Sequence, residues 1–384
     1  MEKNIKKLFW YVGISSLFFE RSIFVLYLIH KGMNIAQISL FQSTINVAML
    51  VGEIPTGIIA DNIGKKKSLL IGSVLMIIYY LSMIFSHTFL LFIFGAAVFG
   101  IGSTFVSGTN TAYLYDLLND KTSSVKMLGR LSAVITGAIG LAMVIGGYLQ
   151  KSSWELIMWL GVIAQIIGVI ILLSLPNIVV RASDAKKSFI YDVYLAFKND
   201  QFLRKALFLL GLNEGVVSSI YILAQAILNK FGMETEHIAY VFCIETLLSV
   251  VAFAKIETFI NKFGRKKVIV FTVVATALAF LGLNTSNIMV ISCMIFLISV
   301  LNNCYTTVLL DEFNHVIEKD IRATAISCFN MMSALFMACI FWTISVLGDN
   351  YIFAFSILGV VSTLSLFGLF KHIGEVPIIL DIEI

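Results

Sequence analysis

Apolar residues occur along this chain in runs of about 20, separated by short polar stretches. A helix needs about 20 apolar residues to cross the hydrocarbon core of a bilayer, so each run predicts one membrane-spanning helix. The predicted helices lie near residues 8–29, 35–60, 68–87, 89–115, 131–150, 154–175, 204–229, 237–258, 268–285, 288–310, 323–347 and 351–371. The pattern therefore predicts an all-α integral membrane fold with twelve transmembrane helices.

The composition excludes a water-soluble protein. Of 384 residues, 59% are hydrophobic and 13% charged, and the mean hydropathy is +0.94. Soluble domains average about 45–50% apolar and about 25% charged residues, so this chain has too few charges to cover its apolar surface. The five cysteines all fall in apolar runs and have no metal-ligand spacing, which predicts neither disulfides nor a metal site.

The positions of lysine and arginine predict the orientation in the membrane. Most of the 27 basic residues fall in segments on the same side as the N-terminus, whereas Lys31, Lys151 and Lys230 fall on the other side. Because cytoplasmic loops carry the excess of lysine and arginine, both termini are predicted to be cytoplasmic. We therefore expect a multi-pass protein of the plasma or inner membrane.

The two halves of the chain resemble each other weakly. Gly32-Met33 and Gly232-Met233 are 200 residues apart, and so are Gly64 and Gly264, each of which precedes a basic run. Parallel repeats of this kind are a known transporter architecture. The stretch between the halves is polar and basic, as in a linker. The predicted domains are an N-terminal six-helix bundle at 1–180, a cytoplasmic linker at 181–203, and a C-terminal bundle with a short cytoplasmic tail at 204–384.

One loop carries a recognisable motif between the second and third predicted helices. Residues 53–67 read EIPTGIIADNIGKKK, with the key positions Gly57, Asp61, Gly64, Lys65 and Lys66. The spacing resembles the cytoplasmic loop signature of the major facilitator superfamily, although that family usually has arginine where Lys65 stands. The related NKFGRKK after the eighth helix extends the resemblance over nearly the whole chain. It implies a secondary transporter with two pseudo-symmetric six-helix bundles.

The resemblance also implies a gate at this loop. Asp61 and Lys65 would form a latch with an acid at the end of the fourth helix, and Asp116 is the matching acid. Glu53 lies two turns from Asp61 and is assigned to the same gate, as is Lys66. The alternative is a basic loop that only determines topology.

Charged residues within the predicted helices are candidates for function, because each costs about 2.5–3.5 kcal/mol at the centre of a bilayer. Besides Glu53 these are Glu20, Arg21, Glu214 and Glu245, and Glu20 and Glu214 are predicted near the midplane. None lies in the third, sixth, ninth or twelfth helix, which the resemblance implies form an outer scaffold. A midplane acid would carry a proton or bind substrate; alternatively, Glu214 or Glu245 only neutralises Arg21.

Uncharged polar residues add candidates to the same cavity. They are Asn46, Ser107, Asn213 and Asn302. Each either lines the substrate path or forms an interhelical hydrogen bond, which contributes about 0.6 kcal/mol.

No nucleotide-binding loop, catalytic constellation or metal cluster is recognisable, so we expect no enzyme activity and no cofactor. The expected function is proton-coupled export of a small amphipathic, cationic or zwitterionic compound, such as a drug, an antibiotic or a peptide-like molecule. An uptake symporter and a membrane receptor on a transporter scaffold are the alternatives. The expected partners are substrate, protons and the lipid bilayer, without nucleic acid, and the expected state is a monomer.

Overall fold

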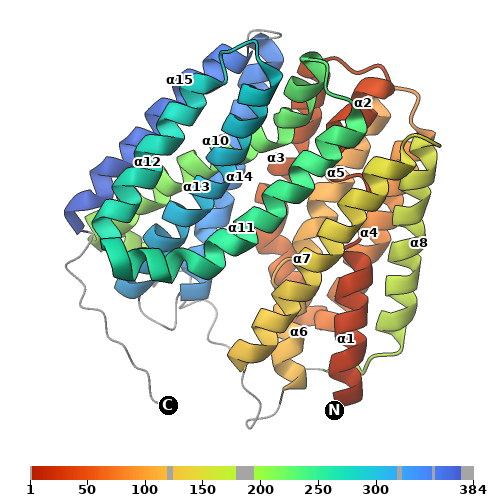
Figure 1. Cartoon of the computed structure of the whole chain (residues 1–384). Coiled ribbons are helices and arrows are strands. Elements are labelled where there is room, and N and C mark those ends of the chain that lie inside the picture. Colours follow the sequence, from red (N-terminus) through yellow and green to blue (C-terminus); the bar gives the residue numbers. More distant parts are fainter. Residues whose placement is uncertain (1, 119–123, 179–193, 318–321, 348–350, 373–384) are drawn as a thin grey trace. The chain divides into compact units, whose positions relative to one another are not determined.

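The structure, a computed structural model, describes residues 2–118, 124–178, 194–317, 322–347 and 351–372, and its regular elements there are helices (Figure 1). They are α1 Glu2–Ser15, α2 Phe24–His30, α3 Ile35–Ile63, α4 Lys65–Phe85, α5 Phe89–Val106, α6 Thr109–Leu117, α7 Ser124–Leu149, α8 Trp154–Leu173, α10 Gln201–Lys230, α11 Thr235–Phe263, α12 Arg265–Gly282, α13 Ile288–Val316, α14 Arg322–Leu347, α15 Tyr351–Ser365 and the 3-10 helix η3 Leu366–His372.

Nine spans within the described residues are long and apolar enough to cross a membrane by length and composition. Three of the twelve predicted helices are not among these nine. The first is divided into α1 and α2, α12 begins with three basic residues, and α11 includes residues whose side chains lie outside the described part of the chain. The all-helical membrane fold predicted from the pattern is confirmed.

The chain forms two compact units. Unit 1 comprises Met1–Ala182, Gln225–Cys243 and Ala338–Gly348, and unit 2 comprises Ser183–Ala224, Ile244–Met337 and Asp349–Ile384. Within unit 1, α4 packs against α5 and α8; within unit 2, α12 packs against α13 and α15. Of the predicted linker, residues 181–193 lie outside the described part of the chain.

The repeat expected from the sequence is visible in how corresponding helices end. At the end of α2, Gly32 N donates to Ile29 O at 2.9 Å and Met33 N to Leu28 O at 3.0 Å; 200 residues later the end of α10 has the same two bonds at 2.9 and 3.0 Å. These bonds form a Schellman motif, which needs a left-handed residue. Gly32 and Gly232 supply this residue with φ of 86° and 91°. Gly64, between α3 and α4, and Gly264, between α11 and α12, also have positive φ, of 94° and 85°.

Two predicted helices are interrupted. The first is unwound over residues 16–23, between α1 and α2, although no proline or glycine lies there. The fourth is divided at Ser107 and Gly108, where Gly108 has a φ of 70° that a helix cannot contain. Pro55, by contrast, lies inside the continuous α3.

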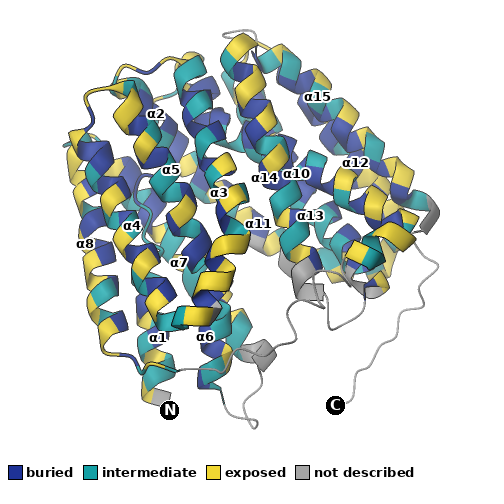
Figure 2. Ribbon diagram, turned by 180° about the vertical axis from the view of Figure 1, so that it is seen from behind, coloured by how far each residue is buried: buried dark blue, intermediate teal, exposed yellow. Residues whose placement is uncertain are grey.

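The outer flank of α8 shows how these helices meet lipid. In Figure 2 the ribbon of α8 is yellow, for exposed residues, along its outer side and dark blue, for buried residues, towards the neighbouring helices. The exposed apolar residues recur every three or four positions: Leu156, Trp159, Ile163, Ile166, Ile170 and Leu173. A stripe at this spacing is one helix face, and an apolar face this long suits a hydrocarbon environment.

The orientation leads to a labelling prediction. In a cysteine-free background, His87→Cys, in the exposed turn between α4 and α5, should react with an impermeant maleimide added to intact cells. Asn62→Cys, exposed at the end of α3, should react only after the cells are permeabilised, because the adjacent lysines retain that loop in the cytoplasm. Labelling of Asn62→Cys in sealed cells would reverse the orientation.

Candidate functional site

The unwound segment in unit 1 turns two adjacent charges in different directions. The carboxylate of Glu20 is buried, with 4% of the residue exposed, and accepts hydrogen bonds from Tyr80 Oη at 3.1 and 3.2 Å. Arg21 is exposed. Because Glu20 points towards α4, it lies inside the helix bundle of unit 1 rather than on an open surface.

Hydrogen bonds to two other helices hold this segment. Gln225, near the end of α10, accepts from Val25 N at 2.9 Å and donates through Nε2 to Arg21 O at 3.0 Å. Ser22 Oγ donates to Met143 O on α7 at 3.2 Å. The segment that carries Glu20 is therefore attached to α4, α7 and α10.

In unit 2 the other two predicted acids both contact the same helix, α13. Glu214 on α10 accepts from Asn302 Nδ2 at 3.1 Å and from Ser218 Oγ at 3.0 Å. Glu245 on α11 is buried and accepts from Ser299 Oγ at 2.5 Å and Ser249 Oγ at 2.9 Å. The two carboxylates are bound by donors from the same two turns of α13.

A further contact extends this network. Asn303 Nδ2 on α13 donates to Ser249 Oγ at 3.1 Å, and Thr306 Oγ1 donates to Asn302 Oδ1 at 3.3 Å. Sequence reasoning pointed to Asn302 but not to Ser299 or Ser249. Ser249 lies four residues after Glu245 on α11, and Ser299 lies one turn before Asn302 on α13. This spacing is the signal that could have identified them.

Of three further predicted candidates, two form side-chain hydrogen bonds within the helix bundle. Asn213 is buried, where it accepts from Tyr305 Oη at 2.7 Å and donates to Thr363 Oγ1 at 3.2 Å, joining α10 to α13 and α15. Asn46 donates to Gln42 O of its own helix at 2.8 Å. Ser107 is exposed at the interruption after α5. Asn213 and Asn46 therefore have partners that satisfy part of their hydrogen-bonding capacity within the bundle.

The surroundings of the three acids share one property. Within each unit as described, no lysine, arginine or histidine forms an ion pair with Glu20, Glu214 or Glu245, and the hydrogen bonds to them come from hydroxyl and amide groups. A carboxyl group held by neutral donors gains or loses a proton without leaving a buried cation unpaired. The described residues also contain no cluster that could hold a metal ion.

The predicted latch is present in part. Lys65 Nζ lies 2.7 Å from a carboxylate oxygen of Asp116 and donates to Ala112 O at 3.2 Å. The side chain of Asp61 lies outside the described residues. Lys66 instead donates to Leu173 O at 3.0 Å and Leu175 O at 2.6 Å, so it caps the end of α8.

The other gate candidates, Gly57 and Glu53, lie on α3. Gly57 is exposed, and no described atom lies within 4 Å of the position that its Cβ would take. Glu53 is half-buried, one turn before Gly57.

Unit 2 has a counterpart of the latch that sequence reasoning missed. Arg265, 200 residues after Lys65, binds two acids of α13: Nη1 to Glu312 Oε1 at 2.5 Å and Nη2 to Asp311 Oδ2 at 2.7 Å. Although burial opposes it, hydrogen bonds to Glu312 and Asp311 raise the pKa of the Arg265 guanidinium, so it stays charged. Glu312 is itself only 2% exposed. The repeated glycine-plus-base pattern was visible in the sequence; its acidic partners were not.

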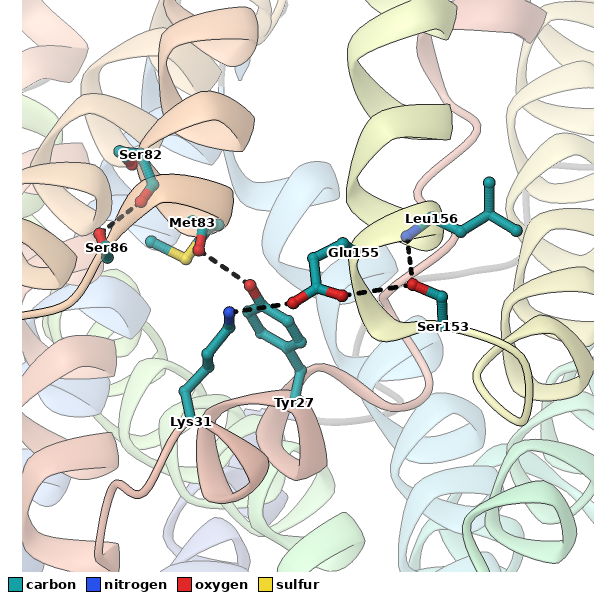
Figure 3. A network of polar contacts seen from close by, with 8 residues as sticks. All are labelled: Tyr27, Lys31, Ser82, Met83, Ser86, Ser153, Glu155 and Leu156. Carbon is teal, nitrogen blue, oxygen red and sulfur yellow. Dashed lines mark hydrogen bonds and ion pairs between the residues drawn. The ribbon is translucent and has the colours of Figure 1, made fainter.

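A polar network fastens α2 to the rest of unit 1 (Figure 3). Lys31 Nζ lies 3.4 Å from Glu155 Oε1, and Ser153 Oγ donates to Glu155 Oε2 at 3.3 Å. Tyr27 Oη donates to Met83 O on α4 at 2.8 Å. Short α2 is therefore fixed at its far end, and the unwound segment is the part of the first predicted helix between this network and α1.

Lys151 and Glu236 form a third ion pair among the described residues of unit 1, between the α7–α8 turn and α11. The hydrogen bond from Lys151 lowers the pKa of Glu236, and the same bond raises the pKa of Lys151. The contribution of Glu236 is therefore lost only as pH falls below its ordinary value of about 4.3, and that of Lys151 only as pH rises above about 10.4. The pair stays charged at neutral pH.

The two helical units, with their repeated glycine turns and ion pairs at corresponding turns, agree with the family to which the sequence is similar. The sequence profile described as Major Facilitator Superfamily matches residues 9–341. The chain belongs to this superfamily. Together with the apolar helices, membership makes it a multi-pass membrane protein and confirms the resemblance seen in the loop motif.

Individual relatives are distant. Sugar transporter ERD6-like 6 of Arabidopsis thaliana is 29% identical over 136 residues, a stretch that covers 34% of this chain and 26% of that protein. A mutant of the nucleoside transporter NupG matches with a TM-score of 0.79 at 17% identity, covering 95% of this chain and 98% of its own. A D-xylose-proton symporter matches with a TM-score of 0.71 at 13% identity, covering 95% and 96%. At these identities the structures support the superfamily fold alone.

The two loop pairs lead to a stability prediction. Arg265→Met leaves the buried Glu312 without its cation and should lower the free energy of unfolding by about 3 kcal/mol. Lys65→Met should cost less, about 1–2 kcal/mol, because Asp116 is more exposed and only one acid loses its partner. Chemical unfolding of the purified variants in detergent measures both.

An exposed lysine of unit 2 provides the control for these two variants. Lys262→Met removes a cation that is exposed near the end of α11 and should leave stability unchanged within about 0.5 kcal/mol. A larger loss for Lys65→Met than for Arg265→Met would show that Glu312 does not depend on Arg265.

Proposed function

We propose that this member of the superfamily is a proton-coupled secondary transporter for a small polar, cationic or zwitterionic solute, working by alternating access. The observation that carries the proposal is the set of acids whose hydrogen bonds, among the described residues, come from neutral donors: Glu20 in unit 1 and Glu214 and Glu245 in unit 2. Transport, rather than catalysis, is the activity that such acids in apolar helices support.

Glu214 is the strongest candidate for the coupling group. It is half-buried, whereas Glu20 and Glu245 are buried, so a proton or a solute reaches Glu214 most readily. Its partner Asn302 has an amide that donates to the ionised carboxylate and can rotate to accept from the protonated one. Both protonation states therefore keep a hydrogen bond, which lowers the cost of the change.

The chemistry around Glu214 supports a solute that forms hydrogen bonds. Asn302, Asn303 and Thr306 on α13 offer amide and hydroxyl groups beside the two acids. A cationic or zwitterionic amine would match a carboxylate in such a setting, because an unpaired charge there is costly and a paired one is not.

Export by exchange is the direction we favour. If a proton and a cationic solute compete for Glu214, each binds only after the other leaves, and the two move in opposite directions. The direction expected from the sequence, efflux of drug-like, antibiotic or peptide-like compounds, follows from such an exchange. We place the protein as a monomer in the plasma or inner membrane with both termini in the cytoplasm, as the Lys/Arg asymmetry predicts.

Uptake by symport is the second candidate, and one observation favours it. Glu20 is held in unit 1, separately from the acids of unit 2, so a proton and a solute can occupy different sites at the same time. One of the structurally similar proteins is named a D-xylose-proton symporter, so symport is the activity given for that protein.

The latch is part of the proposal. Lys65 forms an ion pair with Asp116 in unit 1, and Arg265 forms ion pairs with Asp311 and Glu312 in unit 2. The sequence motif adds Asp61 to the first of these. We propose that they stabilise one of the two conformations of the transport cycle. Such pairs can bias an equilibrium only where they differ between the states.

The coupling proposal is tested in sealed proteoliposomes that contain the pH indicator pyranine. A panel of lipophilic cations, dipeptides, nucleosides and pentoses is added outside, and the internal pH is recorded. For at least one compound the wild type should change the internal pH, and Glu214→Gln, which keeps shape and hydrogen bonds but cannot ionise, should abolish the change. Alkalinisation as the compound enters indicates antiport; acidification indicates symport.

The matched control is Glu257→Gln, which removes the same charge from an exposed position on α11 and should leave proton movement at the wild-type level. A Glu214→Gln variant that moves protons as fast as the wild type would exclude Glu214 as the coupling group. No proton movement by the wild type with any compound of the panel would contradict the proposed function.

A further inference from the structure

Gln225 lies on α10 at the point where the chain passes from unit 2 to unit 1. Residues of α10 before it belong to unit 2, and Gln225 is the first that belongs to unit 1. Its side chain is 4% exposed, and both ends of its amide are used: Oε1 accepts from Val25 N and Nε2 donates to Arg21 O. Both partners are backbone groups at the unwound segment 16–23.

The bond to Val25 replaces a missing helix cap. The first N–H groups of a helix have no partner within the helix, and the residue before it usually supplies one from its side chain. For α2 that residue is Ile23, which has no side-chain acceptor. Val25 N belongs to the second residue of α2, the position that such a cap normally satisfies. Gln225 is therefore the N-cap of α2, supplied from another helix.

Most of the unwound segment satisfies itself by local turns. Arg21 N donates to Phe18 O at 3.2 Å, Ile23 N to Glu20 O at 2.9 Å, and Tyr27 N to Ile23 O at 2.9 Å. Arg21 O and Val25 N are the groups that depend on Gln225. In an apolar environment without water, a backbone group without a partner costs about 1–3 kcal/mol, so removing this amide should destabilise the local conformation.

The opposite side of the segment is held by close packing rather than by an amide. A Cβ added at Gly146 on α7 would lie 1.7 Å from Phe19 O. This contact needs glycine and brings the two backbones together. The segment is thus packed tightly against α7 and attached to α10 by two hydrogen bonds.

Glu20 lies in the middle of this segment, so its surroundings depend on the same two bonds. Its carboxylate faces Tyr80, and the other ionisable groups within electrostatic reach are Tyr79 and Arg21. A change in the backbone at 20–25 would move Glu20 relative to Tyr80. The state of α10 is thereby linked to the state of a buried acid in unit 1.

We propose that Gln225 is a positioning residue that caps the interrupted first helix from α10 and so holds Glu20 against Tyr80. When α10 withdraws, Arg21 O and Val25 N lose their partner, and segment 16–23 changes conformation and releases Glu20. This role rests on the proposed transport function for its purpose, but the contact and its loss do not depend on any substrate.

The test is hydrogen–deuterium exchange of the full-length protein in nanodiscs, followed in peptides that cover residues 16–28. Gln225→Leu should raise exchange there by about tenfold, the factor that corresponds to a hydrogen-bond contribution of about 1.4 kcal/mol. Gln225→Glu separates capping from space-filling. A protonated carboxyl group both donates and accepts, as the amide does, whereas a carboxylate only accepts.

Because position 225 is buried, burial favours the neutral form of the introduced carboxyl group. Gln225→Glu should therefore exchange like the wild type at about pH 5 and faster than the wild type at about pH 9, each compared at the same pH. Gln165→Leu is the matched control: this amide on α8 donates to Ser15 O at 2.9 Å, at the end of α1, and has no contact with Val25 or Arg21. It should give no pH-dependent difference.

Wild-type exchange in Gln225→Leu would overturn the proposal, as would a Gln225→Glu variant whose exchange relative to the wild type is the same at both pH values. These results are distinct from failure of the transport function. Exchange is measured without substrate, so Gln225 can be excluded while Glu214→Gln still abolishes proton movement, and the reverse.

Discussion

A polar group inside a bilayer has no water to bind, so it must find its partner within the protein. The contacts described above follow from this constraint. Gln225 satisfies two backbone groups of an interrupted helix, Lys66 binds the free carbonyls at the end of α8, and α13 supplies donors to Glu214 and Glu245. We propose that at the acids a proton or a solute can replace one partner with another, and that transport uses this exchange.

The neutral character of the donors decides what the acids can do. An acid paired with a buried cation is fixed in its ionised form, because protonation would leave the cation unpaired. Arg265 forms ion pairs with its two acids in unit 2. Glu214, Glu245 and Glu20 are bound by amides and hydroxyl groups instead. The proposed coupling role rests on this difference.

The sequence was sufficient for the fold because hydropathy, the positive loops and the glycine-plus-base repeat are properties of residues close together in the chain. It also indicated the acids, since a charge in an apolar run is conspicuous. It did not predict the interruption at 16–23, because no proline or glycine marks the segment and its partner Gln225 lies far along the chain. For the same reason Asp311 and Glu312 were not recognised as partners of Arg265, and Lys66 was assigned to the gate rather than to the end of α8.

Infrared spectroscopy of the protein reconstituted in lipid tests the central claim most directly, because a protonated carboxyl group has a C=O stretching band that a carboxylate lacks. The account predicts that binding of a transported solute changes this band in the wild type, and that Glu214→Gln removes the change while Glu257→Gln does not. If solute binding leaves the band of the wild type unchanged, or if Glu214→Gln shows the wild-type change, a proton-coupling role for Glu214 is contradicted.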